Sequence, residues 1–155
     1  PHQSSAASDV YKRQAYGAGH ATVAGACVTI LKAFFDTSTV LIKDSNNEYK
    51  FKHKEDQDQF IAFRTNSSGT DLITEDINNI SEALTLEGEL NKLAANISIG
   101  RNMAGVHYFS DYYDSIRMGE QIAIGILQEQ ALTYSTDPFV MSVPTFDGNI
   151  VRIGY

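Results

Sequence analysis

Two short stretches of the sequence carry residue types that together could bind an oxyanion. The first is Gly17-Ala18-Gly19-His20, which precedes a run of helix-forming residues. Glycine lets the backbone approach a ligand closely, and the unpaired N–H groups of a helix N-terminus attract negative charge. The imidazole of His20 lies where it could exchange a proton with a bound oxyanion. The alternative interpretation is an ordinary glycine turn beside a histidine that has no chemical role.

The second stretch contains Arg101, His107 and Asp111. Arg101 follows an apolar, small-residue helical segment, so we expect its guanidinium to face the interior, where it needs a counter-anion. His107 and Asp111 are four residues apart, so they share one face if this segment is helical, and the carboxylate can then fix the imidazole tautomer. The alternatives are an arginine that caps helix carbonyls and a His–Asp pair with a structural role only.

The composition excludes several classes of protein. The 155 residues are 43% hydrophobic and 20% charged, as expected of one ordinary globular domain. The net charge of −7 argues against a sequence-independent nucleic-acid binder, which needs a basic surface. The sequence has no run of eighteen apolar residues, so we predict no membrane-spanning helix. The single cysteine, Cys27, excludes an internal disulfide and is predicted to lie in the core, and no zinc-binding motif is present.

Three helical regions are predicted to position the candidate residues. In the first, from His20 to Phe34, apolar residues at helical spacing form the predicted buried stripe, and small residues allow another helix to approach. The stripe is Val23, Cys27, Ile30, Leu31 and Phe34, and the small residues are Ala21, Ala24, Gly25 and Ala26. The second region begins at Thr74 and, after a further N-cap signal at Thr85, continues to Gly100. The third runs from about Asp111 to Leu132.

Residues 36–66 are predicted to form an irregular, exposed insertion. Residues 40–42 are a short β-compatible run, and residues 49–53 alternate apolar side chains with lysines, as in a half-buried strand. Residues 57–66 fit either a strand or a short helix. Near the end of the chain, Asp147-Gly148 lies between β-branched runs and predicts a hairpin. The predicted fold is therefore a mainly α-helical bundle with a small β-hairpin element.

The first fourteen residues differ in character from the rest. They are a small polar run that ends in Asp9-Val10-Tyr11-Lys12-Arg13-Gln14, a hexapeptide encoded by one reading frame of a common sequencing adapter. We therefore predict that residues 1–14 are a non-native, adapter-derived segment, the alternative being a native terminus. On this interpretation, residues 15–155 are the C-terminal part of a catalytic domain in a longer protein.

Taken together, the two stretches resemble the vanadium-dependent haloperoxidases, and bacterial bromoperoxidase-type sequences in particular. Their superfamily also contains the type 2 phosphatidic acid phosphatases and the bacterial class A acid phosphatases. Its pattern is a motif with Lys and Arg, then Pro-Ser-Gly-His, then Ser-Arg, five residues, His, three residues and Asp. Here Gly17-Ala18-Gly19-His20 matches the second motif, and Arg101, His107 and Asp111 match the third without a gap. The resemblance implies the helical bundle of that superfamily.

The resemblance implies vanadate as the cofactor and a role for each matching residue. His107 would be the protein ligand of vanadium, with Asp111 orienting its other ring nitrogen. Arg101 and the backbone amide of Gly19 would hold vanadate oxygens. His20 would be the acid–base group that takes a proton from hydrogen peroxide. The implied activity is the oxidation of a halide, bromide foremost, to hypohalous acid by hydrogen peroxide, with a small organic acceptor.

Two departures from the family pattern stand out. Ala18, at a position expected to contact vanadate, replaces the serine of the motif, so one hydroxyl contact is absent. The lysine and arginine of the first motif are not in this chain. We therefore expect that Arg101 alone would leave the negative charge of vanadate under-neutralised. The alternatives are an acid phosphatase on the same scaffold, with the histidine as nucleophile, and a non-catalytic helical module. The resemblance also implies a homo-oligomer in the periplasm or outside the cell.

Overall fold

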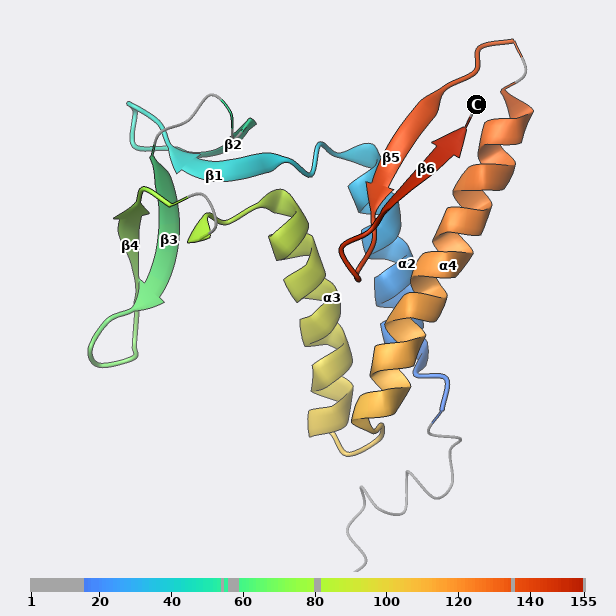
Figure 1. Cartoon of the computed structure of the whole chain (residues 1–155). Helices are drawn as coiled ribbons and strands as arrows, with labels where there is room; N and C mark the ends of the chain where they lie inside the picture. The colour runs from blue at the N-terminus through green and yellow to red at the C-terminus, as the bar shows by residue number, and fades with distance from the viewer. Residues whose placement is uncertain (1–15, 54, 56–58, 80–81, 135, 155) are drawn as a thin grey trace, which may run out of the picture. The chain divides into compact units, whose positions relative to one another are not determined.

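The computed structural model describes residues 16–53, 55, 59–79, 82–134 and 136–154 (Figure 1). The predicted adapter-derived segment, residues 1–14, lies outside these described residues. The chain divides into two compact units. The first, called the helical unit below, combines the residues up to Phe35 with those from Leu90 onward, and the second spans Asp36–Glu89. All the candidate site residues belong to the helical unit.

Helices α2 (Gly19–Phe34), α3 (Leu86–Met103) and α4 (Phe109–Thr133) correspond to the predicted helical regions, although the second of them starts later than predicted. Within the helical unit, α2 and α4 begin at the end where α3 finishes (Figure 1). The strands β5 (Val140–Pro144) and β6 (Ile150–Gly154) pair antiparallel and pack on α2 and α4. The hairpin predicted near the end of the chain is thereby confirmed.

The backbones of α2 and α4 approach each other at two glycines. A Cβ atom added at Gly25 would lie 3.0 Å from the carbonyl carbon of Ile116, and one added at Gly119 would lie 2.8 Å from the backbone nitrogen of Ala26. The Gly119 Cβ would lie closer still to the carbonyl oxygen of Thr22. The prediction that small residues in the first helix let another helix approach closely is confirmed.

The buried face of α2 is not the predicted apolar stripe. The buried residues of α2 are Ala21, Ala24, Gly25, Val28, Thr29 and Lys32. Val23 and Phe34 are 62% and 80% exposed, and Cys27, predicted to lie in the core, is exposed as well. The physical reason is the close helix contact, since only small side chains fit where two helix backbones touch. The larger apolar residues of α2 therefore lie on other faces of the helix.

The second unit is more ordered than the irregular insertion that was predicted. It contains two antiparallel pairs, β1 (Thr39–Lys43) with β2 (Tyr49–His53) and β3 (Phe60–Thr65) with β4 (Leu72–Ile77). Its core is formed by Val40, Ile42 and Phe60, against which Ile77 and Ala83 pack. The described residues thus form helices and three two-stranded sheets, so the predicted mainly α class is only partly right.

Two local predictions in this unit are wrong. Thr74 does not begin a helix, because residues 74–77 pair with residues 60–63 in the β3–β4 hairpin. The acidic residues that looked like a first helical turn belong to β4 instead. β2 is exposed along its whole length, so it is not half-buried. The second N-cap signal is confirmed, since Thr85 Oγ1 accepts the backbone N–H of Gly88 at 3.0 Å at the start of α3. No described helix is long and apolar enough to cross a membrane.

Candidate functional site

The start of α2 presents backbone N–H groups without a side-chain cap. Gly17 has a φ of +88°, a left-handed conformation that favours glycine, and it turns the chain into the helix. Ala18 is the N-cap residue and makes no side-chain capping hydrogen bond. The N–H groups of a first helical turn have no partner within the helix. Gly19 is exposed, and no atom would lie within 4 Å of a Cβ added there. The arrangement therefore suits an approaching anion.

Ala18 itself faces the interior. It is 1% exposed and belongs to an apolar cluster with Ala21 and Ile116, against which Tyr112 and Phe146 pack. Its backbone N–H donates a 2.9 Å hydrogen bond to the hydroxyl of Ser115 in α4. Both the backbone amide and the methyl group of Ala18 are thus engaged in holding the loop, and the next residue, Gly19, is exposed.

Arg101 lies in the last turn of α3 and is partly buried, as its position in the sequence predicted. Its Nε is buried and has no hydrogen-bond partner among the described residues. The side-chain oxygen of the neighbouring Asn102 is also buried without a hydrogen-bond partner among the described residues. A buried guanidinium nitrogen without a partner is costly, and an anionic ligand would remove that cost. After Arg101 the chain turns at Gly105, which has a φ of +70°.

His107 and Asp111 lie together at the start of α4. Their side chains are 12% and 6% exposed, and Nδ1 of His107 lies 3.8 Å from Oδ2 of Asp111. That distance is too long for a hydrogen bond but short enough for a charge interaction. The same Oδ2 accepts the backbone N–H of Tyr108 at 2.8 Å. Asp111 therefore anchors the first turn of α4 and sets the electrostatic environment of the imidazole.

The two halves of the candidate site meet through α4. The hydrogen bond from Ala18 to Ser115 joins the loop before α2 to the second turn of α4, one turn after Asp111. The end of α3 reaches α4 through only five residues, 104–108. His20 is exposed at the first turn of α2 and lines an open pocket of about 560 Å³. The other lining residues are Gly19, Val23, Ala24, Cys27 and Ile97, so the wall of this pocket is mainly apolar.

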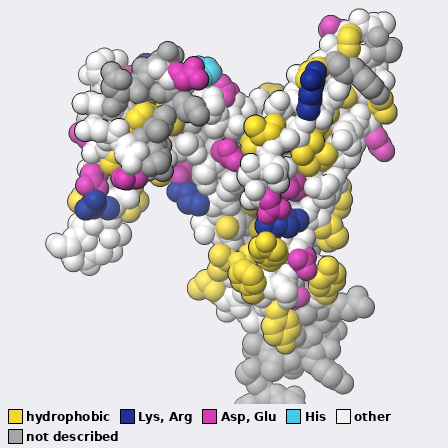
Figure 2. Space-filling model, in the orientation of Figure 1, with side chains coloured by type: hydrophobic (Ala, Val, Ile, Leu, Met, Phe, Trp, Pro, Cys, Tyr) yellow, Lys and Arg dark blue, Asp and Glu magenta, His cyan; other side chains and the backbone are white. Residues whose placement is uncertain are grey.

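The surface around this end of the helical unit is rich in hydrophobic side chains. Figure 2 shows them gathered toward the lower end of the unit, where α3 ends and α4 begins. The large exposed hydrophobic residues of these segments are Met103, Tyr108, Phe109 and Tyr113, and the ring of Phe109 contacts both Tyr112 and Tyr113. The candidate site thus opens beside an apolar and aromatic surface.

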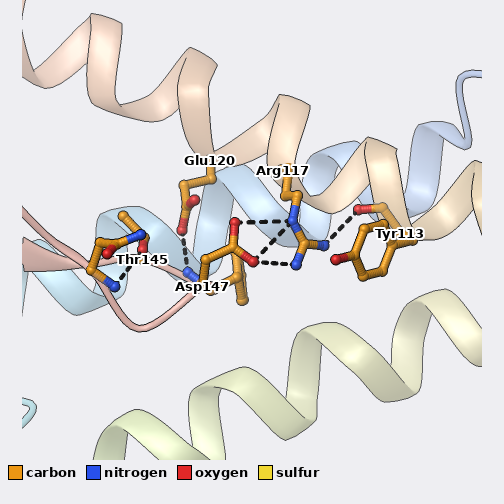
Figure 3. Close-up of polar contacts among 7 residues, drawn as sticks. Tyr113, Arg117, Glu120, Thr145 and Asp147 are labelled. Atoms are coloured by element: carbon orange, nitrogen blue, oxygen red, sulfur yellow. Dashed lines mark hydrogen bonds and ion pairs between the residues drawn. The ribbon is translucent and has the colours of Figure 1, made fainter.

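A polar cluster holds the tip of the β5–β6 hairpin against α2 and α4 (Figure 3). Oε1 of the buried Glu120 accepts the backbone N–H of Phe146 at 2.7 Å, and burial raises the pKa of the Glu120 carboxyl. Nζ of the buried Lys32 donates to the carbonyl of Pro144 at 3.1 Å and lies 4.1 Å from the centre of the Phe146 ring. These groups satisfy one another, so we assign them a structural role.

A second contact at this tip is exposed. Nε of Arg117 donates to both carboxylate oxygens of Asp147 at 3.1 Å, and its guanidinium lies 3.6 Å from the centre of the Tyr113 ring. The guanidinium also holds the pKa of the Asp147 carboxyl below its ordinary value by hydrogen bonding.

Sequence reasoning missed Lys32, Ser115 and Glu120. No pattern marked them, because a polar residue in an amphipathic helix is ordinarily assigned to the exposed face.

The donor set suits an oxyanion better than a bare cation. A guanidinium, a helix N-terminus and imidazoles belong to segments that begin or end at one end of the unit, whereas a metal cation calls for clustered anionic or neutral ligands. No group of three or more His, Cys, Asp or Glu side chains that could hold a metal ion occurs in the described part of the chain. A vanadium bound here is therefore expected as an oxyanion.

No family model matches the chain. It is 50% identical over 138 residues to a vanadium-dependent bromoperoxidase of Corallina officinalis and 49% identical over 138 residues to that of Corallina pilulifera. It is 29% identical over 140 residues to the vanadium-dependent bromoperoxidase of Ascophyllum nodosum. These matches cover 89% of this chain but only 19% to 21% of the relatives, so the chain spans about a fifth of their length. Over that segment, the chain is a homologue of the vanadium-dependent bromoperoxidases.

Proposed function

We propose that this chain contributes to a vanadate-dependent haloperoxidase that oxidises a halide, bromide foremost, with hydrogen peroxide. The observation that carries the proposal is the buried, unpartnered Nε of Arg101, close in sequence to the paired His107 and Asp111. These residues lie in a segment that is 50% identical in sequence to a vanadium-dependent bromoperoxidase. The relatives named above are all bromoperoxidases, which does not favour the acid phosphatase alternative.

The residues present fit vanadate, which carries negative charge on its oxygens. Arg101 would hold vanadate oxygens through its guanidinium, since a planar fork of N–H donors matches an oxyanion. The backbone amide of Gly19 would add a donor at the positive end of α2. Together with His107 as the vanadium ligand, these groups are this chain's share of the site. When bound, vanadate supplies the electrophilic centre at which hydrogen peroxide becomes reactive toward halide.

The His107–Asp111 pair prepares the ligand nitrogen. The carboxylate near Nδ1 favours the tautomer that carries its proton on Nδ1. The lone pair of Nε2 is then available for coordination, as in other histidine ligands oriented by a carboxylate. Because Asp111 also accepts the Tyr108 N–H, the carboxylate is fixed in place before any ligand binds.

His20 would handle the proton of hydrogen peroxide. Its imidazole is exposed one residue after Gly19, and it would accept a proton from a peroxide oxygen at the start of α2. The apolar pocket that His20 lines would admit a small organic acceptor better than an ionic one. Halide, peroxide and acceptor would thus meet at one end of the helical unit.

The test is bromination of a phenol dye by the complete gene product with vanadate, hydrogen peroxide and bromide. Replacing His107 by alanine should abolish bromination, because the ligand nitrogen is lost. His53, in the second unit, offers a matched control, because its Nδ1 lies 3.2 Å from Oδ2 of Asp36 and so also pairs with a carboxylate. The His53→Ala variant should keep full activity. An inactive wild type, or a fully active His107→Ala variant, would refute the proposal, and phosphate-ester hydrolysis without vanadate would support the phosphatase.

A further inference from the structure

The hydrogen bond between Ala18 and Ser115 takes no direct part in the proposed chemistry. It joins a backbone amide to a side chain 97 residues later, and both residues are almost fully buried, with 1% and 2% exposure. A buried amide that lost its acceptor would be left without a partner, so this contact constrains the loop strongly. The constrained residue immediately precedes Gly19, which is exposed at the start of α2.

Ser115 also stands in a fixed relation to the other half of the site. It lies one helical turn after Asp111 in α4, and both residues are buried. One turn further along, Gly119 touches the backbone of α2 at Thr22 and Ala26. The residues 111, 115 and 119 thus form one row on α4. Along that row, α4 contacts His107 at one end, the loop before α2 in the middle and the body of α2 at the other end.

Among the described residues, alternative polar anchors for the loop are few. The N-cap residue Ala18 has no side-chain hydrogen bond, and its methyl group makes only apolar contacts. The carbonyl of Ala18 accepts from the backbone and hydroxyl of Thr22, which are contacts within the first turn of α2 itself. Those contacts shape the turn but do not place it relative to α4. The hydrogen bond to Ser115, together with the apolar packing of Ala18 against Ile116, ties the loop to α4.

We propose that Ser115 is a positioning residue of the oxyanion site. By accepting the Ala18 N–H, it holds the Gly19 amide and His20 at a fixed place relative to the His107–Asp111 pair. This inference rests on the proposed function, because it assigns Ser115 a role in presenting that site to an anion. Ser115 itself would touch neither vanadate nor peroxide.

The experiment compares Ser115→Ala, Ser115→Thr and a control in the complete gene product freed of vanadate. The control is Ser98→Ala, since Ser98 is also fully buried but donates its hydroxyl to Ala94 within its own helix, at 2.8 Å. Hydrogen exchange of the peptide that contains Ala18 reports on the loop. Calorimetric titration with inorganic phosphate, and separately with vanadate, reports on oxyanion binding without any catalytic turnover.

We expect Ser115→Ala to speed exchange of the Ala18 amide at least about tenfold and to weaken phosphate and vanadate binding roughly three- to tenfold, the value of one ordinary hydrogen bond. Ser115→Thr, which keeps the hydroxyl, should restore most of that binding. Ser98→Ala removes a buried hydroxyl without leaving a backbone N–H unpaired, and it should leave oxyanion binding unchanged.

Two results overturn the inference in distinguishable ways. If the wild type binds oxyanions and Ser115→Ala binds them equally well, or if Ser98→Ala weakens binding as much, Ser115 has no positioning role and the proposed function stands. If the wild type binds neither phosphate nor vanadate, the proposed function fails and the positioning role fails with it. Loss of binding in Ser115→Ala with recovery in Ser115→Thr supports both.

Discussion

The close contact between α2 and α4 leads to a sharp prediction for Gly119. Replacing it by alanine adds a Cβ that would lie 2.8 Å from the backbone nitrogen of Ala26 and closer to the carbonyl oxygen of Thr22. These neighbours are backbone atoms of a helix, so they cannot rotate away as a side chain would. The two helices must therefore separate. Gly125, in the same helix, is the matched control, because a Cβ added there meets no atom within 4 Å.

The two substitutions should change stability in opposite directions. Alanine is favoured over glycine inside a helix by about 1 kcal/mol, and this gain applies to both positions. At Gly125 nothing offsets it. At Gly119, overpacking against a backbone costs about 3 kcal/mol, the upper end of the usual range. The Gly119→Ala variant should thus lose about 2 kcal/mol, whereas Gly125→Ala should gain about 1 kcal/mol.

Chemical and thermal denaturation of the purified protein measure this difference. For a domain of this size, about 1 kcal/mol corresponds to roughly 2–4 °C in the melting temperature. Separation of α2 from α4 should also loosen the Ala18–Ser115 hydrogen bond, so Gly119→Ala should bind phosphate less tightly than Gly125→Ala. Equal melting temperatures for the two variants would refute the reasoning, because they would mean that the helix backbones do not touch at Gly119.

Two further predictions concern carboxylates. Asp111→Ala should lose about 1 kcal/mol of stability, because it removes the capping hydrogen bond to the Tyr108 N–H. Asp111→Asn keeps an acceptor oxygen and should stay folded, but its bromination activity should fall at least about tenfold because the charge near His107 is gone. A fully active Asp111→Asn variant would contradict this. Burial raises the pKa of Glu120, so its carboxyl ionises at lower pH in the unfolded chain, and its ionisation increasingly destabilises the fold as pH rises through the unfolded and then the folded pKa. Glu120→Gln keeps an acceptor for the Phe146 N–H, so its free energy of unfolding relative to wild type should increase as pH rises from the ordinary carboxyl pKa of the unfolded chain through the raised pKa of the folded protein. A pH-independent difference in denaturation experiments would show that attraction to Lys32 balances the burial.

The sequence alone predicts elements better where the signal is local. Asp147-Gly148 marks the hairpin because a turn of this kind needs a residue such as Gly148, whose φ is +77°. Thr85 marks the start of α3 because its side chain caps a backbone N–H three residues on. Thr74 carries a similar local pattern, yet it forms a strand, because pairing with β3 is a contact that no short window of sequence displays.

The candidate site residues likewise divide into those that a local sequence pattern reveals and those that depend on contacts between distant parts of the chain. Arg101, His107 and Asp111 are close in sequence, so their spacing reveals a common site. The face that α2 buries is harder to predict, because periodicity selects the largest apolar residues, whereas the interface with α4 selects the smallest. Ser115 could not be found at all, since a serine within a helix gives no sign that its acceptor role serves an amide 97 residues earlier.

The helical unit is built from two separate stretches of chain, with the whole of Asp36–Glu89 intervening between them. Because Ala18, Ser115 and the two glycine contacts join those stretches directly, the geometry of the site does not depend on covalent continuity through the intervening segment. Insertions and deletions there should be tolerated over evolution far more readily than any change of length within residues 101–119. A cut by a protease inside that segment should leave two pieces that remain associated.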